Sequence, residues 1–141
     1  MLNTYQSIVI NEPIKNVWDR VKNFHDMSWT PNVITKCVAD GDISGTEIGA
    51  KRILNDVFYE TLIELNEDEH RIRYSIDNGP SPISQDDVSN YIGDLHLLPI
   101  TINDTTFVEW SSSWESESQE AIEFCHNIYV ALLDDLSASF K

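Results

Sequence analysis

A lysine among apolar residues is the first candidate for a chemical role. In an extended chain Lys36 shares one face with Ile34 and Val38, because side chains alternate between the two faces of a strand. A lysine on an apolar face needs a partner, since charged residues are rarely buried alone. One interpretation is a cation that pairs with a carboxylate of a bound ligand. The alternative is a lysine that extends from the strand edge into water, or one that pairs with Glu60 or Glu109.

The histidines and cysteines show no spacing that predicts a metal site or a nucleophile. Cys37 and Cys125 lie far apart and match no metal-binding or redox motif, so we expect two free thiols on buried faces. Free thiols fit a reducing compartment. No zinc motif is present, and no nucleophile is placed beside any histidine, the four being His25, His70, His96 and His126. We therefore predict no metal and no cofactor, and these residues identify no catalytic group.

The composition excludes several classes of function. The 141 residues include 24 acidic and 9 basic side chains, which give a formal net charge of -15. Phosphate backbones and anionic membrane surfaces repel such a chain, so we expect no nucleic-acid partner. An acidic face that docks a basic partner remains an alternative to a simply solvated surface. The sequence shows neither a signal peptide nor an apolar run that could span a bilayer, which predicts a cytoplasmic protein without membrane insertion.

Hydrophobic periodicity predicts one short helix, a series of strands and one long helix. Pro13 suits the first turn of a helix that ends near Asn23. Short connections rich in turn residues indicate that successive strands are antiparallel. The strands are predicted over residues 2–10, 33–40, 47–54, 57–65, 70–77, 88–98 and 105–115, and a helix fills the chain after Ser116.

These elements fit one α+β domain over residues 1–141. An antiparallel sheet must cover its apolar face, and the long last helix is available to do so. The apolar stripe of that helix consists of Ala121, Cys125, Ile128, Tyr129, Leu132 and Leu136. A strongly curved sheet around one helix rarely fills its interior completely, so we expect a pocket for a small ligand between them.

Six short motifs follow one another along the chain. They are Pro13-x-x-x-Val17-Trp18, Trp29-x-Pro31, Gly49-x-x-Arg52, Tyr59-Glu60-Thr61-Leu62, Tyr74-x-Ile76-x-x-Gly79-Pro80-x-Pro82 followed by Asn90-Tyr91, and Val108-Glu109-Trp110. Their order and spacing over nearly the whole chain resemble the START-related polyketide cyclase/dehydratase and lipid-transport (SRPBCC) superfamily. The resemblance implies the helix-grip fold, in which a curved antiparallel sheet wraps around a long C-terminal helix and encloses a cavity.

One branch of this superfamily suggests where pocket residues lie. Plant abscisic-acid receptors are similar around Ile34-Thr35-Lys36-Cys37-Val38, where a lysine meets the carboxylate of the hormone. The resemblance implies a pocket lined by Lys36, Glu60, Tyr74, Ile76, Tyr91, Glu109, Phe124 and Ile128, and Trp29 is expected near its mouth. The first gate loop is far shorter here, at Asn55-Asp56, and the second gate sequence is absent. The resemblance therefore implies the position of the pocket and not hormone reception.

Strand alternation disagrees with the resemblance about the two glutamates. Alternation turns Tyr59, Thr61, Ile63 and Leu65 inward, which puts Glu60 on the outer face. It likewise buries Val108 and Trp110 and turns Glu109 outward, unless a β-bulge near residues 111–113 intervenes. A buried glutamate would have a raised pKa and could act as an acid or base, whereas a solvated one would not.

The sequence therefore supports a carrier or sensor that binds a small, largely apolar or aromatic molecule in an internal pocket. The alternative is a polyketide cyclase/dehydratase-like enzyme, in which Glu60 or Glu109 moves protons together with Tyr91. A third interpretation is an interaction protein that uses its acidic face. The expected partner is a small hydrophobic molecule whose identity the sequence does not specify.

Overall fold

Seven antiparallel strands form one curved sheet in the computed structural model, which describes residues 1–141. The strands are β1 (Leu2–Ile10), β2 (Cys37–Ala39), β3 (Lys51–Leu54), β4 (Phe58–Asn66), β5 (Arg71–Asn78), β6 (Ser89–Ile100) and β7 (Thr105–Glu115), and the helices are α1 (Ile14–Val21) and α2 (Glu120–Ala138). Their order across the sheet is β1-β7-β6-β5-β4-β3-β2. Long β6 and β7 lie near one edge and the shortest strands at the other.

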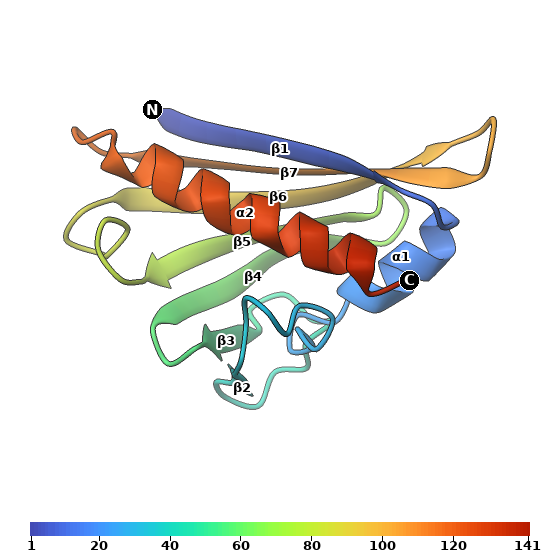
Figure 1. Ribbon diagram of the computed structural model, residues 1–141. Helices are drawn as coiled ribbons and strands as arrows, with labels where there is room; N and C mark the ends of the chain where they lie inside the picture. Colours follow the sequence, from blue (N-terminus) through green and yellow to red (C-terminus); the bar gives the residue numbers. More distant parts are fainter.

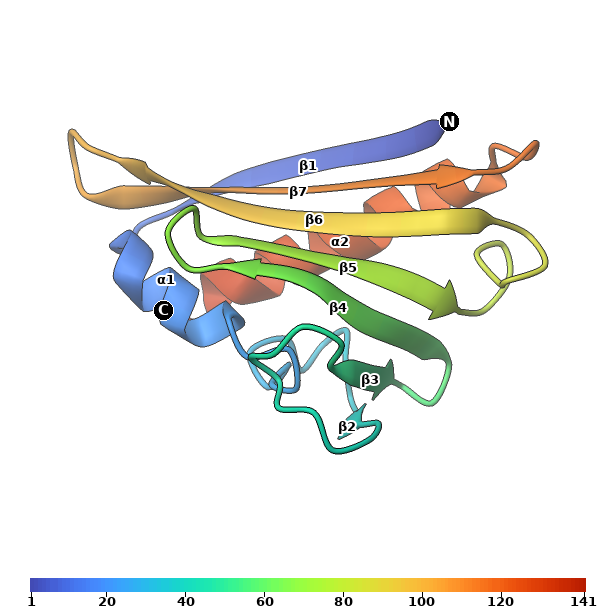
Figure 2. The ribbon, with the colours of Figure 1, turned by 180° about the vertical axis from the view of Figure 1, so that it is seen from behind.

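Helix α2 lies across one face of the sheet, which we call the inner face (Figure 1). Figure 2 shows the opposite, outer face, which no helix covers. The buried side of α2 recurs every three or four residues, through Ala121, Cys125, Tyr129, Leu132 and Leu136, as an amphipathic helix requires. This confirms the predicted α+β helix-grip fold. Neither helix is long and apolar enough to cross a membrane.

The segment before β2 is less extended than the sequence predicts. Only residues 37–39 of the predicted strand 33–40 pair with a neighbour. The Asn55 side chain binds the preceding residues instead: its Oδ1 accepts hydrogen bonds from the amides of Thr35 and Lys36, and its Nδ2 donates to the carbonyl of Val33. An asparagine in the β3–β4 turn thus takes the hydrogen bonds that a strand partner would otherwise make.

The loop of residues 27–34 is fastened to the end of α2 by Asp135. This carboxylate accepts hydrogen bonds from Thr30 Oγ1 at 2.9 Å, from the Asn32 amide at 3.1 Å and from Asn32 Nδ2 at 2.9 Å. Met27 and Ile34, at the two ends of the loop, are buried against the core. The contact closes one wall of the space between α2 and the sheet.

A glycine on β6 makes room for an aromatic ring on the inner face. Gly93 pairs with Tyr74 of β5 across the sheet. A Cβ atom on Gly93 would lie 2.2 Å from Cζ of the Tyr74 ring, so any larger residue would displace that ring. The position of Tyr74 in the core therefore depends on the missing side chain.

Candidate ligand-binding cavity

A cavity of about 40 Å³ lies between α2 and the inner face of the sheet. Hydrophobic residues make up 13 of the 15 that line it. The lining consists of Met27, Ile34, Arg52, Leu54, Phe58, Glu60, Tyr74, Ile76, Ile83, Tyr91, Trp110, Cys125, Ile128, Tyr129 and Leu132. A single water needs about 10–15 Å³, so a cavity of this size holds only a few waters. A ligand with an aromatic ring would require the walls to move apart.

The cavity comes closest to solvent between α2 and strands β4 and β5. Phe58 of β4, Ile76 of β5 and Ile128 of α2 are half-buried, whereas most of the other lining residues are buried. The three belong to elements that cross near one another in Figure 1. We define Phe58, Ile76 and Ile128 as the mouth.

A buried ion pair forms the polar wall of the cavity. Glu60 of β4 pairs with Arg52 of β3 across the sheet, and both side chains are only 6% exposed. Glu60 Oε1 accepts hydrogen bonds from Arg52 Nε at 2.9 Å and from Nη2 at 2.7 Å. Burial raises the pKa of Glu60 above its usual value, and the charge of Arg52 limits that rise. The guanidinium also stacks on the Phe24 ring, 3.7 Å from its centre.

Three tyrosine hydroxyls form a second polar group at the cavity. Tyr129 of α2 shares hydrogen bonds with Tyr74 of β5 at 3.0 Å and with Tyr91 of β6 at 2.8 Å. Trp110 Nε1 donates to the Tyr74 hydroxyl at 3.0 Å. Burial raises the pKa of all three tyrosines well above their ordinary value, so they remain neutral donors and acceptors at physiological pH.

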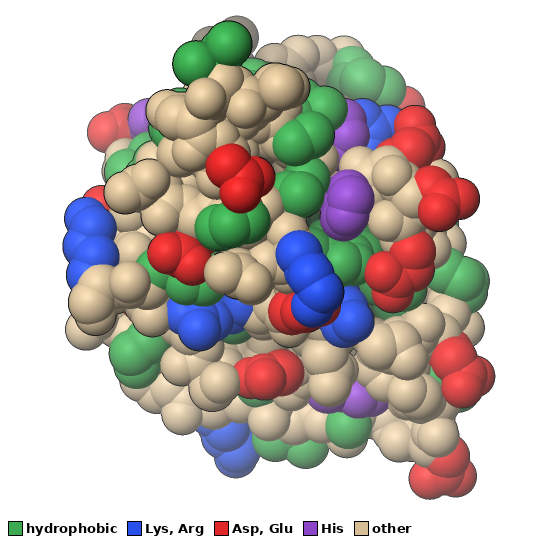
Figure 3. Space-filling view, turned by 90° about the vertical axis from the view of Figure 1, so that its right-hand side faces the viewer, with side chains coloured by type: hydrophobic (Ala, Val, Ile, Leu, Met, Phe, Trp, Pro, Cys, Tyr) green, Lys and Arg blue, Asp and Glu red, His purple; other side chains and the backbone are tan.

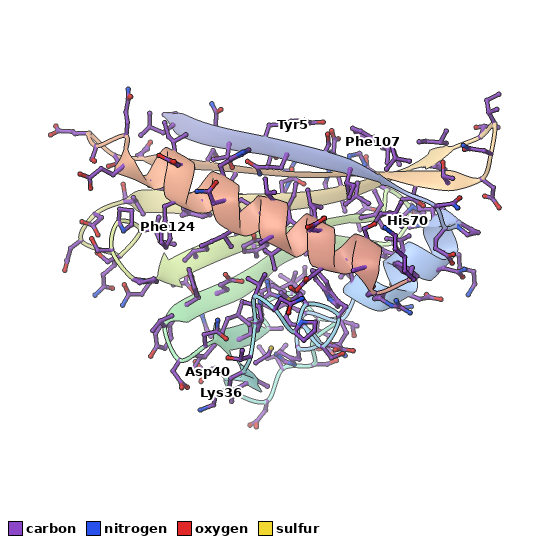
Figure 4. The ribbon with its side chains drawn as sticks, viewed as in Figure 1. Tyr5, Lys36, Asp40, His70, Phe107 and Phe124 are labelled. Atoms are coloured by element: carbon purple, nitrogen blue, oxygen red, sulfur yellow. The ribbon has the colours of Figure 1, made fainter.

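Five of the nine candidate residues from the sequence line the cavity: Glu60, Tyr74, Ile76, Tyr91 and Ile128. Trp29 is buried away from the mouth, where it packs against Trp110 beside a smaller cavity of about 20 Å³. Phe124 packs on the edge of the core at the start of α2 and does not reach the cavity (Figure 4). The structure therefore does not support a position at the mouth for Trp29 or in the lining for Phe124.

Lys36 lies outside the cavity, contrary to the expectation from the resemblance. Its side chain is 55% exposed and its Nζ lies 2.9 Å from the Asp56 carboxylate. Figure 4 shows it beside β2, at the rim of the molecule. The Asn55 side chain holds the backbone of this segment in a turn, so the alternation of a regular strand does not apply to Lys36.

Glu109 points to the outer face, as alternation predicts and contrary to the resemblance. Its Oε2 accepts a hydrogen bond from the Tyr5 hydroxyl at 2.6 Å, and its Oε1 lies 3.1 Å from His96 Nδ1. The Tyr5 hydrogen bond lowers the pKa of Glu109, with a further contribution from His96. The buried neighbours Val108 and Trp110 fix the inner face of β7 without a bulge.

The alternation prediction is wrong for residues 59–63 of β4, where Glu60 and Leu62 are buried and Tyr59 and Ile63 are exposed, whereas Leu65 packs against the core as predicted. Both faces of this strand carry apolar residues, so periodicity alone does not choose between them. Register shifts near Glu60 and after Leu62 further disturb the alternation. The inward orientation of Glu60 allows its carboxylate to form the ion pair with Arg52 on the neighbouring strand.

Several lining residues, above all Arg52 and Tyr129, do not follow from the sequence patterns. A signal for Arg52 exists: it and Glu60 lie at equal distances on either side of Asp56, in the turn of the β3–β4 hairpin, which makes them cross-strand partners. Tyr129 was assigned to the apolar stripe of the last helix, but its hydroxyl contacts require the tertiary structure.

Comparisons with known proteins agree with this fold. The sequence matches the family described as polyketide cyclase / dehydrase and lipid transport over residues 1–140. No curated protein matches it significantly. A solved structure of a protein from Nitrosospira multiformis is 52% identical, with a TM-score of 0.98 and coverage of 99% of this chain and 97% of that one.

More distant structures share the same architecture. The protein XoxI from Bacillus cereus is 28% identical, with a TM-score of 0.81, and the match covers 99% of this chain and 96% of that one. The major latex-like protein 151 of Panax ginseng is 14% identical, with a TM-score of 0.77, and the match covers 97% of this chain and 95% of that one. At this identity the similarity concerns the fold only. Family and fold together support a ligand-binding function. The chain belongs to the polyketide cyclase/dehydrase and lipid-transport family.

Proposed function

We propose that this protein binds a small, largely apolar or aromatic molecule in the cavity between α2 and the sheet. The observation that carries the proposal is the composition of the cavity wall, in which 13 of 15 residues are hydrophobic and the charged pair of Arg52 and Glu60 completes the lining. Apolar concave sites with a few placed polar groups are typical ligand sites. The lipid-transport part of the family description also supports it.

Binding requires the cavity to expand from its volume of about 40 Å³. Ile83 lies in the loop between β5 and β6, and the mouth residues Phe58 and Ile76 lie near the ends of β4 and β5 that adjoin loops. Loops move more readily than the sheet to which they are attached. We expect the ligand to enter at the mouth and to separate α2 from the β3–β4 and β5–β6 connections.

Native mass spectrometry of the freshly purified protein tests the proposal, by comparison with the mass after denaturation. A retained small molecule is the expected result. In the variant Ile128→Trp the mouth is filled and retention should fall, whereas Val130→Trp, on the exposed side of the same helix, is the matched control. Equal retention in both variants would place the molecule outside the cavity and contradict the proposal.

A second candidate function is acid–base catalysis by Glu60 on a bound polyketide-like or cyclic substrate. The observation that favours it is a buried carboxyl with a raised pKa beside the cavity, a property common among catalytic acids and bases. Glu109 cannot share this role, because it lies on the outer face.

Mass spectrometry of the retained molecule also tests catalysis. Incubation should convert it to a product lighter by one water, through dehydration or through a ring closure that releases water. Glu60→Gln should stop the conversion while the molecule is still retained. Retention of an unchanged molecule over prolonged incubation would leave binding as the function and rule out catalysis on that molecule.

A further inference from the structure

One oxygen of the buried Glu60 carboxylate has no hydrogen-bond partner in the protein. Both hydrogen bonds from Arg52 are accepted by Oε1, at 2.9 and 2.7 Å, and no donor lies within hydrogen-bonding distance of Oε2. Glu60 is 5% exposed and lines the cavity. Because Glu60 lines the cavity and Oε2 has no partner in the protein, a donor supplied from the cavity would bind this oxygen favourably.

The cavity offers no unpaired cation. Besides its bonds to Glu60, Arg52 donates through Nη1 to the Phe24 carbonyl at 2.9 Å, and the same nitrogen lies 3.4 Å from Met27 Sδ. No other lysine, arginine or histidine lines the cavity, and Lys36 pairs with Asp56 at the surface. An anionic ligand would therefore lose its hydration without gaining a counter-charge.

The other polar groups of the wall already satisfy one another. The hydroxyls of Tyr74, Tyr91 and Tyr129 form a chain of hydrogen bonds, and Trp110 Nε1 donates to its Tyr74 end. The strongest unused acceptor at the cavity is thus Glu60 Oε2, because hydrogen bonds to ionised groups are about twice as strong as neutral ones.

Building on the proposed function, we propose that the ligand carries a neutral hydrogen-bond donor, a phenol or alcohol hydroxyl, which binds Glu60 Oε2. The rest of the ligand packs against the apolar wall of the cavity and extends towards the mouth. Carboxylic acids, which ionise at neutral pH, are rejected, because the carboxylate of Glu60 would face a second carboxylate with Arg52 already engaged.

Three matched probes test this inference by isothermal titration calorimetry at pH 7: 2-naphthol, 2-methoxynaphthalene and 2-naphthoate. The three probes share one ring system. 2-Naphthol carries a hydrogen-bond donor, 2-methoxynaphthalene carries an acceptor without a donor, and 2-naphthoate carries an anionic group. We expect 2-naphthol to bind at least about 10-fold more tightly than 2-methoxynaphthalene, which corresponds to about 1.4 kcal/mol, and 2-naphthoate to bind most weakly.

Two variants locate the effect. The double variant R52M/E60L removes both charges without leaving one unpaired, so the preference for 2-naphthol should disappear while 2-methoxynaphthalene still binds. Lys36→Ala should leave all three affinities unchanged. If the double variant does not fold, as judged by circular dichroism, the ranking in the unaltered protein decides.

The outcomes separate this inference from the proposed function. Binding of 2-naphthoate as tight as that of 2-naphthol, or no preference for the hydroxyl over the methoxy group, would overturn the inference and leave a ligand-binding cavity in place. Failure of all three probes to bind, with no molecule retained in native mass spectrometry, would overturn the proposed function and the inference with it.

Discussion

At the scale of single residues, the Arg52–Glu60 pair combines a structural role with the chemistry of the cavity. Removing two charges from water costs several kcal/mol for each ion, which the pair recovers only with good geometry. Here the guanidinium bonds the carboxylate twice, bonds the Phe24 carbonyl and stacks on the Phe24 ring. Removing one partner leaves an uncompensated charge in the interior.

We expect Glu60→Gln to lower the free energy of unfolding by about 3–5 kcal/mol, because Arg52 would lose its counter-charge. Urea denaturation measures the change. R52M/E60L should be much less destabilised than the single variant, because neither charge remains. The control is Glu64→Gln on the same strand. The Glu64 side chain is 38% exposed and its ion pair with Arg73 is long, at 3.8 Å. For this variant a loss of unfolding free energy below about 1 kcal/mol is expected. Equal losses for Glu60→Gln and Glu64→Gln would contradict the role of burial.

The outer face offers a pH-dependent contact. The pKa of Glu109 is lowered chiefly by the Tyr5 hydrogen bond, so this contact stabilises the fold above the pKa of the unfolded state, about 4.3. The stabilisation is lost as the pH falls through the lower pKa of the folded state.

Tyr5→Phe should raise the Glu109 pKa towards its ordinary value and reduce the stabilisation at neutral pH. Carbon-13 NMR titration of the carboxyl groups measures the pKa directly. Tyr59→Phe, which removes the hydroxyl of another exposed tyrosine, should leave the Glu109 pKa unchanged. An unaltered Glu109 titration in Tyr5→Phe would show that the hydrogen bond is not the main cause.

At the scale of elements, α2 does more than cover the sheet. Its Asp135 accepts three hydrogen bonds from Thr30 and Asn32, which holds the loop 27–34 and the cavity residues at its ends. A negative charge in the last turn of a helix is unfavourable to the helix itself. The position of this aspartate is therefore explained by the loop that it binds.

We expect Asp135→Ala to lower the free energy of unfolding by about 2–3 kcal/mol, because hydrogen bonds to a charged acceptor are lost. Amide hydrogen exchange should become faster at residues 30–34. Asp134→Ala, at the exposed neighbouring position, is the matched control and should change neither quantity. Unchanged exchange in Asp135→Ala would mean that other contacts hold the loop.

At the scale of the whole molecule, the excess of acidic residues sets the surface. With 24 acidic and 9 basic side chains, most carboxylates cannot find a basic partner. Figure 3 shows acidic side chains spread over one end of the molecule, with fewer basic ones among them. Self-repulsion of this kind destabilises a compact state, and salt screens it.

Raising the sodium chloride concentration from about 10 to about 300 mM should raise the Tm by several degrees, because the screening length falls from about 30 Å to below 10 Å. Differential scanning calorimetry measures the shift. Sucrose at equal osmolality is the control, since it acts without screening. A Tm that responds equally to sucrose and to salt, or to neither, would contradict self-repulsion as the cause.

The order of elements, the helix-grip fold and the apolar side of α2 could be predicted from the amino-acid sequence alone. These features follow from local patterns, namely strand alternation, turn residues and helical spacing. Each pattern involves residues only a few positions apart, so it can be recognised without knowledge of the tertiary structure. β1 and β7 have the predicted boundaries, because long strands with one buried face leave little choice of register. Five of the residues that the resemblance to abscisic-acid receptors implied also line the cavity of this structure.

Which charged side chains face the cavity depends on contacts between residues that are distant in the sequence. Lys36 turns outward because Asn55, about twenty residues later, binds its backbone. Glu60 turns inward, where it meets Arg52, although the apolar residues on both faces of β4 made either orientation plausible. Glu109 turns outward to Tyr5, more than one hundred residues earlier in the chain. The burial of a charge depends on partners that folding brings together, and local periodicity contains no information about them.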